Sequence, residues 1–304
     1  MTLQPTEIED PHDPRLARGA EGLLRTFNEG GVLDASDVHV ARRLCALAGE
    51  DEPLVALAVA FVVRAVRGGS VCVDLTTVGE EDLDLPWPDP QAWLAAVAAS
   101  DLATSPTPVL RTLEHGDVRL LYLDRYWREE EQVHADLVGR PAGTAAPDEA
   151  WLSSALGRVF PDGYAEQAAA ARVALTHATT VLTGGPGTGK TTTVAALLAL
   201  CAEQAELAGE PVLRIALAAP TGKAAARLQK AVEDEVAKLP AADQARLAGV
   251  RAVTLHRLLG ARPDTSSRFR HHRDNRLPHD VIVVDETSMV SLTCLLYTSD
   301  AADE

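Results

Sequence analysis

Residues 184–191 constrain the fold of this chain more than any other segment, because they read Gly-Gly-Pro-Gly-Thr-Gly-Lys-Thr. A short apolar run, 180–183, precedes them, and an alanine- and leucine-rich run, 192–200, follows. This order predicts a strand, a glycine-rich loop and a helix, which is the context in which the pattern binds phosphate. At such a junction the backbone N–H groups favour negative charge at one spot. The sequence therefore predicts a nucleoside-triphosphate site rather than a glycine-rich turn with a chance lysine.

The loop predicts a role for each polar side chain in it. We expect the Lys190 ammonium to bind the β- and γ-phosphates of ATP, and the Thr191 hydroxyl to ligate Mg²⁺. ATP and Mg²⁺ are therefore the expected cofactors. The predicted nucleotide-binding residues of the loop are Gly184, Gly185, Pro186, Gly187, Thr188, Gly189, Lys190, Thr191 and Thr192.

A second pair of acidic residues follows the β-branched run 281–284, which is typical of a strand buried on both faces of a parallel sheet. Asp285 and Glu286 then stand at the carboxyl end of that strand, where α/β folds bind ligands. We expect Asp285 to hold Mg²⁺ and Glu286 to deprotonate the attacking water. Many strands end in solvated acids, and the phosphate loop in the same chain is what favours the catalytic interpretation.

Charge is distributed unevenly along the 304 residues. Residues 1–150 hold 12 Arg, no Lys and 27 acids, whereas residues 151–304 hold 16 basic and 17 acidic residues, so most of the net charge of −16 belongs to the first half. The four cysteines show no C-x-x-C spacing, which indicates neither zinc nor a disulfide framework. The first ten residues are polar and the apolar run 54–63 is too short to span a bilayer, so a cytoplasmic protein without a membrane segment is expected.

Changes of composition divide the chain into segments. The polar residues 1–20 are expected to be flexible, and 21–138 to form a mainly helical domain that docks partners. The Gly-, Pro- and Ala-rich stretch 139–150 is the predicted linker, and an α/β domain with a parallel sheet is expected over 151–293. Helices are predicted at 37–48, 53–66, 90–99, 151–160 and 164–177, and strands at 71–75, 118–122, 180–183, 212–219 and 281–284.

A second lysine-containing turn narrows the class of enzyme. The apolar run 212–219 ends in Pro220-Thr221-Gly222-Lys223 and enters an alanine-rich helix, which presents another helix N-terminus with a lysine. A motor that grips a single strand needs such a phosphate contact beside its ATP site. The predicted DNA-binding residues are Pro220, Thr221, Gly222, Lys223, Thr254 and His256. The alternatives are that Lys223 only solvates the start of its helix and that His256 is a packed structural residue.

Between residues 251 and 276 the chain carries seven arginines against Asp264 and Asp274. Such a basic stretch could follow a phosphate backbone. An ordinary solvated loop remains the alternative for any single arginine in it.

Taken together, the segments 184–193, 219–228, 254–260 and 283–290 resemble successive motifs of superfamily-one DNA helicases. They are most similar to the exodeoxyribonuclease V alpha-subunit (RecD) family. Residues 121–131 also resemble a segment of that family. The resemblance implies a RecA-like P-loop NTPase domain, with Gln167 reading the adenine. It further implies ATP-driven 5′→3′ translocation on single-stranded DNA, in a heterotrimer with RecB-like and RecC-like subunits that processes double-strand ends.

The sequence departs from that family after Thr293. Residues 294–304 read as the translation of a sequencing adapter, so we expect them to be a non-native tail; a genuine divergent C-terminus is the alternative. The chain also ends soon after the magnesium motif, so an incomplete motor is expected. A second RecA-like domain would supply a transition-state arginine, whose loss costs about 10³–10⁵ in rate in related NTPases. The fragment is therefore expected to bind nucleotide but to turn it over poorly.

Two other functions stay open at this point. A stand-alone helicase of the same family carries helix-hairpin-helix modules, and residues 1–120 lack a clear series of such hairpins. Alternatively, the acidic first half acts mainly as a protein-docking module, because its charge would repel DNA and suit a protein interface.

Overall fold

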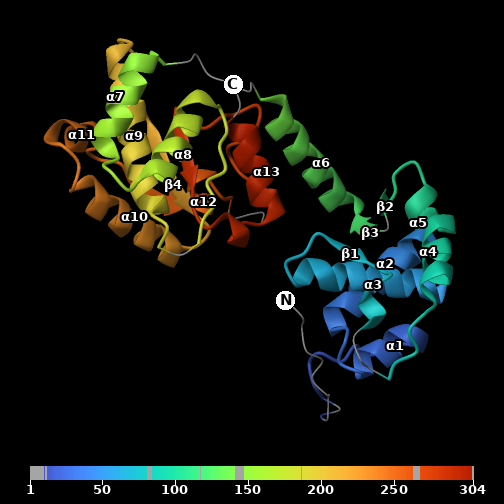
Figure 1. The fold of residues 1–304 in the computed structure, drawn as a ribbon. Coiled ribbons are helices and arrows are strands. Elements are labelled where there is room, and N and C mark those ends of the chain that lie inside the picture. The colour runs from blue at the N-terminus through green and yellow to red at the C-terminus, as the bar shows by residue number, and fades with distance from the viewer. Residues whose placement is uncertain are drawn as a thin grey trace. The chain divides into compact units, whose positions relative to one another are not determined.

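A computed structural model of the chain describes residues 10, 12–80, 84–116, 118–140, 147–185, 187–262 and 268–302. Pro186 of the phosphate loop lies outside the described residues, as do 1–9 and 11, 141–146 of the predicted linker, and 303–304 of the predicted tail. The chain forms two compact units, Met1–Glu131 and Gln132–Glu304 (Figure 1). The boundary lies within helix α6 (Asp124–Gly139), ahead of the predicted linker, and the domain bounds expected from the sequence stay predictions.

The first unit is mainly helical, as predicted. Its elements are α1 (Gly22–Glu29), α2 (Ala35–Ala48), α3 (Pro53–Arg67), β1 (Cys72–Asp74), η1 (Val78–Glu80), α4 (Pro90–Ala99), α5 (Asp101–Thr104), β2 (Leu110–His115), β3 (Val118–Leu123) and the start of α6. The strands form an antiparallel sheet in the order β1-β3-β2. The predicted helices and strands of this unit are confirmed. β2 was not predicted, because four of its six residues are exposed and it carries no clear apolar alternation.

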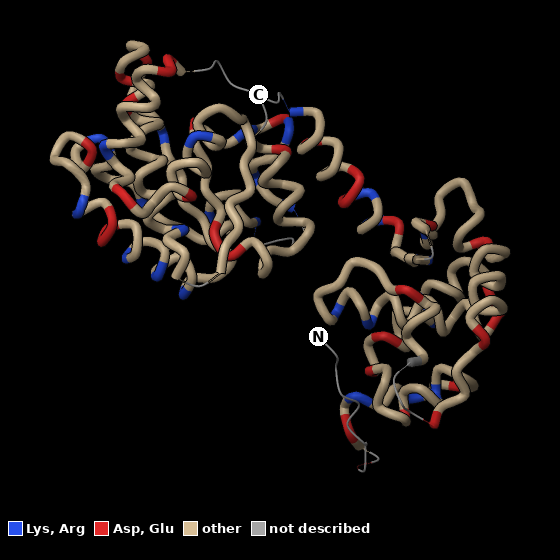
Figure 2. Tube along the Cα trace, in the orientation of Figure 1, with Lys and Arg blue, Asp and Glu red and all other residues tan. Residues whose placement is uncertain are grey.

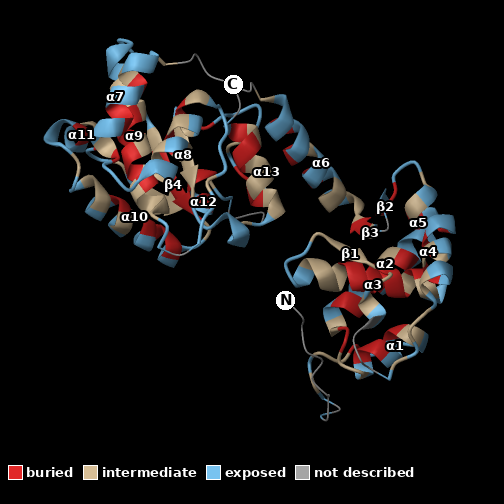
Figure 3. Cartoon of the chain, viewed as in Figure 1, coloured by how far each residue is buried: buried red, intermediate tan, exposed pale blue. Residues whose placement is uncertain are grey.

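Helix α3 forms the centre of the first unit's core. Its residues from Leu57 to Val62 are at most 1% exposed, and Figure 3 colours this stretch as buried. Trp93 of α4 packs against it and donates from Nε1 to the Leu54 carbonyl at 2.8 Å. The fully buried Asp37 of α2 closes a capping box with Asp34 and accepts from Arg67 Nη2 at 2.9 Å. Helix α2 is therefore fixed to α3 by both apolar packing and a partly buried ion pair.

The second unit is an α/β domain with a parallel sheet, as predicted. Its elements are the end of α6, α7 (Glu149–Val159), α8 (Ala165–Thr176), α9 (Lys190–Leu207), β4 (Ile215–Ala219), α10 (Gly222–Val236), α11 (Ala241–Arg246), β5 (Ala252–Thr254), α12 (Leu255–Leu258), β6 (Val281–Val284), η2 (Thr287–Met289) and α13 (Leu292–Ala301). The strand order is β5-β4-β6, and both pairs are parallel. Among the helices of the described residues, none combines the length and apolarity that crossing a bilayer requires.

The strand predicted at 180–183 is wrong. These residues pair with no strand of the described sheet, and Val181 is 80% exposed. A central strand of a parallel sheet is apolar on both faces, whereas this segment offers only Val181 and Leu182 between two threonines. Because β6 pairs only with β4 among the described strands, its four residues are half-buried rather than fully buried as expected. The strand predicted at 212–219 is shorter in the structure, since Val212 is 88% exposed and β4 begins at Ile215.

Side chains alternate between the two faces of this sheet. Leu217 and Val283 pack with α9 and α10, whereas Ala218 and Val284 pack with α12 and α13. Before the strands begin, Arg214 Nη2 donates to Asp280 Oδ1 at 2.7 Å and lowers the pKa of that carboxyl. At the opposite edge, the carboxyl ends of all three strands meet, and there each strand leads into one of the predicted site motifs.

Candidate nucleotide and nucleic-acid site

The phosphate loop adopts backbone conformations that require glycine. Gly187 and Gly189 have φ values of 77° and 81°, in the left-handed region that L side chains rarely adopt. A Cβ added to Gly184 would lie 2.6 Å from Thr188 Oγ1, so a side chain there would displace the threonine. Gly189 is the N-cap of α9, so the loop leads directly into a helix N-terminus. Backbone N–H groups at such a junction favour a bound anion.

Lys190 lies over the loop that precedes it. Its Nζ donates to the carbonyl oxygens of Gly184 at 2.5 Å and Gly185 at 2.8 Å, and the Thr188 hydroxyl donates to the Gly185 carbonyl at 2.9 Å. Gln167 of α8 donates from Nε2 to the Thr188 carbonyl at 2.9 Å. The structure thus brings Gln167 to the phosphate loop, while its reading of adenine stays a prediction.

The residues expected to hold Mg²⁺ fit the ion's chemistry. Magnesium prefers one or two protein oxygen ligands together with substrate phosphates and water, rather than a cage of carboxylates. Thr191 offers a half-buried hydroxyl in the first turn of α9, beside Thr192, and Asp285 offers an exposed carboxylate after β6. Asp285 is fixed at its backbone, where its N–H donates to the Ala218 carbonyl at 2.9 Å. Within the described residues no cluster of three His, Cys, Asp or Glu forms a separate metal site.

Glu286 has a strained backbone. Its φ of 50° and ψ of 44° lie in the left-handed region, and within the described residues it is the only non-glycine residue with positive φ. Such a conformation costs about 1–3 kcal/mol and is found most often at functional sites. The positive φ turns the chain immediately after Asp285, at the carboxyl end of β6.

The Pro220–Lys223 turn begins α10 in the way the sequence predicts. Thr221 is the N-cap, and its hydroxyl accepts from the Ala224 N–H at 3.1 Å. Three of the four lysines have partners: Lys190 binds the loop carbonyls, while Lys230 and Lys238 pair with carboxylates at 2.7 and 2.6 Å. Lys223 is exposed and has no hydrogen-bond or ion-pair partner within the described residues. Its ammonium is available to a ligand.

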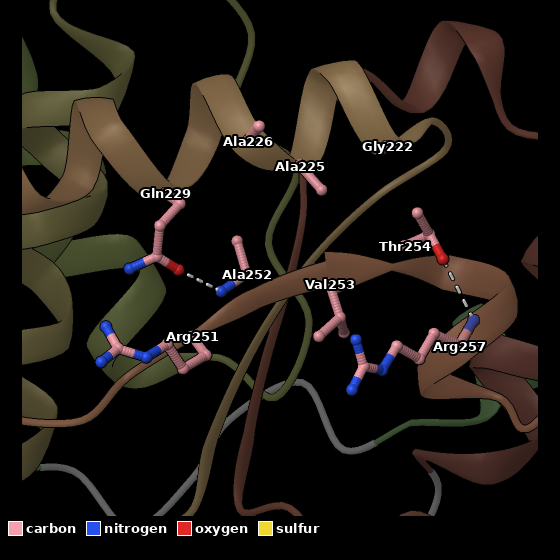
Figure 4. Close-up of a pocket in the computed structure, with 9 residues that line it drawn as sticks. All are labelled: Gly222, Ala225, Ala226, Gln229, Arg251, Ala252, Val253, Thr254 and Arg257. Atoms are coloured by element: carbon pink, nitrogen blue, oxygen red, sulfur yellow. Dashed lines mark hydrogen bonds between the residues drawn. The ribbon is translucent and has the colours of Figure 1, made fainter.

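An open groove of about 480 Å³ runs between α10 and β5, next to this turn (Figure 4). Arg251, just before β5, and Arg257, beyond its end, are among the residues that line it, and Gly222 lies at the start of α10. The groove is lined by Gly222, Ala225, Ala226, Gln229, Arg251, Ala252, Val253, Thr254 and Arg257. Small side chains on α10 and two guanidinium groups leave room and positive charge for a phosphate backbone.

Thr254 and His256 have structural roles in addition to any contact with DNA. Thr254 is the N-cap of α12 and accepts from the Arg257 N–H at 3.2 Å. His256 is exposed, and its ring meets Phe269 edge to face with centroids 5.5 Å apart. The structure brings Thr254 into the groove with Gly222, whereas His256 is not one of the residues that line it.

The structure adds Gln229, Arg251 and Arg257 to the predicted site. The two arginines belong to the predicted basic stretch, but arginine content alone does not indicate which members of the stretch line a groove. Arginines and lysines are marked in blue along the second unit in Figure 2. Gln229 carries no sequence signal, since its position depends on how α10 packs against β5.

Two family models match the chain. The model described as "RecBCD enzyme subunit RecD, N-terminal domain" covers 29–118, and the model described as "AAA domain" covers 167–298. The AAA match spans the phosphate loop and all three parallel strands, which confirms the predicted RecA-like P-loop NTPase fold of this unit.

Curated RecD subunits of two organisms are similar to the chain over nearly its whole length. The RecBCD enzyme subunit RecD of Mycobacterium tuberculosis is 63% identical over 298 residues, which cover 95% of this chain and 49% of the relative. The subunit of Mycolicibacterium smegmatis is 64% identical over 278 residues, covering 90% of this chain and 48% of the relative. The ATP-dependent RecD2 DNA helicase of Deinococcus radiodurans is 33% identical over 215 residues, which cover 68% of this chain and 26% of the relative. The chain thus spans about half the length of the RecD subunits it matches, and it belongs to the RecD family.

Proposed function

We propose that the chain is the nucleotide-binding part of an ATP-dependent DNA helicase subunit of the exodeoxyribonuclease V (RecBCD) type. The observation that carries this proposal is the phosphate loop, with two left-handed glycines and Lys190 at the start of α9. The similarity to proteins named RecBCD subunit RecD and ATP-dependent RecD2 DNA helicase supports the same class.

In this proposal the chain's own residues bind and activate ATP. Lys190 exchanges its loop carbonyls for β- and γ-phosphate oxygens, and the loop N–H groups hold the phosphate chain. Thr191 and Asp285 hold Mg²⁺, which neutralises charge on the phosphates when bound. Glu286 accepts a proton from the water that attacks the γ-phosphorus, as the bond to ADP breaks. Since the AAA match covers one domain, 167–298, and the transition-state arginine of related motors comes from a second, hydrolysis by this chain alone is expected to be slow.

The DNA path in this proposal is the groove between α10 and β5. Lys223 and the N-terminus of α10 bind phosphates at one end, and Arg251 and Arg257 bind them along β5. Because these contacts reach the backbone and not the bases, binding should not depend on sequence. Translocation in the 5′→3′ direction along single-stranded DNA, in the repair of double-strand breaks, is the function this arrangement would serve.

The acidic first unit is proposed to dock RecB-like and RecC-like subunits in a cytoplasmic heterotrimer. Residues 1–131 hold 24 acids against 11 arginines, which disfavours DNA and suits a basic protein surface. Docking alone, without a motor function, would leave the phosphate loop without a role. The stand-alone helicase is the second candidate, but the match of 29–118 to the N-terminal domain of the RecBCD subunit favours the subunit.

Substitution of Lys223 tests the DNA path. Lys223→Ala should weaken binding of a single-stranded oligonucleotide and lower the slope of log affinity against log salt by about one unit. ATP binding without DNA should remain. Lys230→Ala is the matched control, because Lys230 lies on the same helix and is already paired with Asp234. Unchanged affinity and slope in Lys223→Ala would remove the structural reason for placing DNA in this groove.

A further inference from the structure

The edge of β5 that does not pair with β4 is hydrogen-bonded by a side chain of α10. β5 lies at the edge of the described sheet and pairs with β4, so one side of its backbone faces away from the sheet. Gln229 Oε1 accepts from the Ala252 N–H at 2.5 Å (Figure 4). Gln229 Nε2 donates to the Val250 carbonyl at 3.4 Å. The carboxamide therefore meets the strand's N–H and C=O groups as the backbone of a neighbouring strand would. This contact fixes one register between α10 and β5.

The same carboxamide also contacts a charged side chain beside the groove. Gln229 Nε2 donates to Glu233 Oε1 at 2.7 Å, and Arg251 Nη1 donates to that same oxygen at 3.4 Å. The Arg251 side chain is 71% exposed, and the Glu233 carboxylate is its ion-pair partner within the described residues. Gln229 thus contacts the lining of the groove in two ways. It bonds directly to the backbone of β5, and it bonds to Glu233, which pairs with Arg251.

We propose that Gln229 is a positioning residue for single-stranded DNA. Lys223 lies six residues before Gln229 on α10, about 9 Å along the helix axis. Arg257 lies just beyond the end of β5, on α12. The Gln229 contact therefore sets the separation between the cation on α10 and those beside β5, and so decides whether one DNA strand can reach all of them. This inference rests on the proposed function, because it assumes that the groove holds DNA.

Apolar packing also holds α10 on the sheet. Leu228 and Val232, on either side of Gln229, are buried against Leu217 of β4. Apolar burial is non-directional, so it holds α10 on the sheet without specifying the register of the helix along β5. Loss of the carboxamide should therefore disturb the groove while the unit stays folded.

The test is Gln229→Met, which keeps the length of the side chain but removes its hydrogen bonds. We expect binding of a fluorescent oligo-dT to weaken about fivefold to tenfold, which corresponds to partial loss of one charge-assisted phosphate contact. The salt slope should fall by about one unit, since one phosphate contact is misaligned. Affinity for a fluorescent ATP analogue, measured without DNA, should stay within about twofold of the parent chain, a difference of under about 0.5 kcal/mol.

Gln244→Ala is the matched control. Its amide also donates to backbone carbonyls, of Leu239 at 2.8 Å and Ala237 at 3.2 Å, but it does not line the groove. This variant should bind DNA with the affinity and slope of the parent chain, even if its thermal midpoint falls.

Three outcomes separate this inference from the proposed function. If Lys223→Ala weakens DNA binding but Gln229→Met leaves affinity and slope unchanged, the inference is overturned and the DNA path stands. If Gln229→Met lowers DNA and nucleotide affinity equally, together with the thermal midpoint, Gln229 is structural and the inference is again overturned. If neither variant changes DNA binding, the DNA path itself fails, and this inference with it.

Discussion

Replacing Lys190 with alanine tests the nucleotide site most directly. The ammonium's two hydrogen bonds go to carbonyls of an exposed loop, where water can replace it. We therefore expect the stability of the unit to change by less than about 0.5 kcal/mol, which is about 2 °C in thermal midpoint for a unit of this size. The fold should be retained.

Nucleotide binding should change more. A charge-assisted hydrogen bond to phosphate contributes about 1.5–3 kcal/mol, and the bonds that Lys190 gives up in the loop offset part of this. A net loss of about 1–2 kcal/mol corresponds to about 5- to 30-fold weaker binding of ATP. Because negative charge develops on the leaving ADP oxygen in the transition state, single-turnover hydrolysis should fall further, by about 10²–10³.

The affinity is measured by titrating a fluorescent ATP analogue, and the hydrolysis by phosphate release in a single turnover. Lys230→Ala serves as the control, because its ammonium is 74% exposed and paired with Asp234 on the same helix. If affinity and hydrolysis in Lys190→Ala both stay within about threefold of the parent chain, a difference below about 1 kcal/mol, the phosphate-loop assignment is refuted.

Glu286→Gln should retain nucleotide affinity and the positive φ at this position but lose hydrolysis, and equal loss of binding and turnover would show that the carboxylate is structural. Asp243→Asn removes a fully buried charge held by two arginines that each have a second acidic partner. It should destabilise the second unit by about 1.5–3 kcal/mol, the contribution of hydrogen bonds to a charged group. Faster hydrogen exchange in α9 and α11 would report this loss, and unchanged exchange would contradict it. Burial raises the pKa of the Cys45 and Cys201 thiols to about 11, so both should resist alkylation at pH 7.5 until the chain is unfolded in urea. Since the folded-state pKa lies above the ordinary 9.0, their contribution to stability is present below pH 9 and is lost between pH 9 and 11, which urea titrations at several pH values would detect.

Local patterns in the sequence predict much of the fold. The run 281–284 forms β6 and the segment 90–99 forms α4 with the predicted bounds, because each has a continuous apolar pattern and clear ends. β2 is missed, since an edge strand with exposed side chains needs no apolar alternation. The segment 180–183 is misassigned, because a nearby phosphate loop favours a strand that its own side chains cannot bury.

The candidate site is also predictable from the sequence only in part. The phosphate loop and the Pro220–Lys223 turn are contiguous motifs, so the sequence shows them directly. The groove depends on which side chains α10 and β5 bring together, and no spacing along the chain encodes that. Thus Arg251 and Arg257 can be predicted only as members of a basic stretch, and Gln229 cannot be predicted at all.

Helix α9 is buried from two directions just behind the phosphate loop. Ala196 and Leu200 pack with α7 and α8, whereas Leu198 and Ala199 pack with the sheet and α10. Ala199 has no exposed surface, so a larger residue there would have to displace the sheet, at a cost of about 1–3 kcal/mol. In homologous chains, substitutions in this stretch of α9 should therefore occur in compensating pairs. A larger side chain on α9 should be matched by a smaller one in the layer that packs against it.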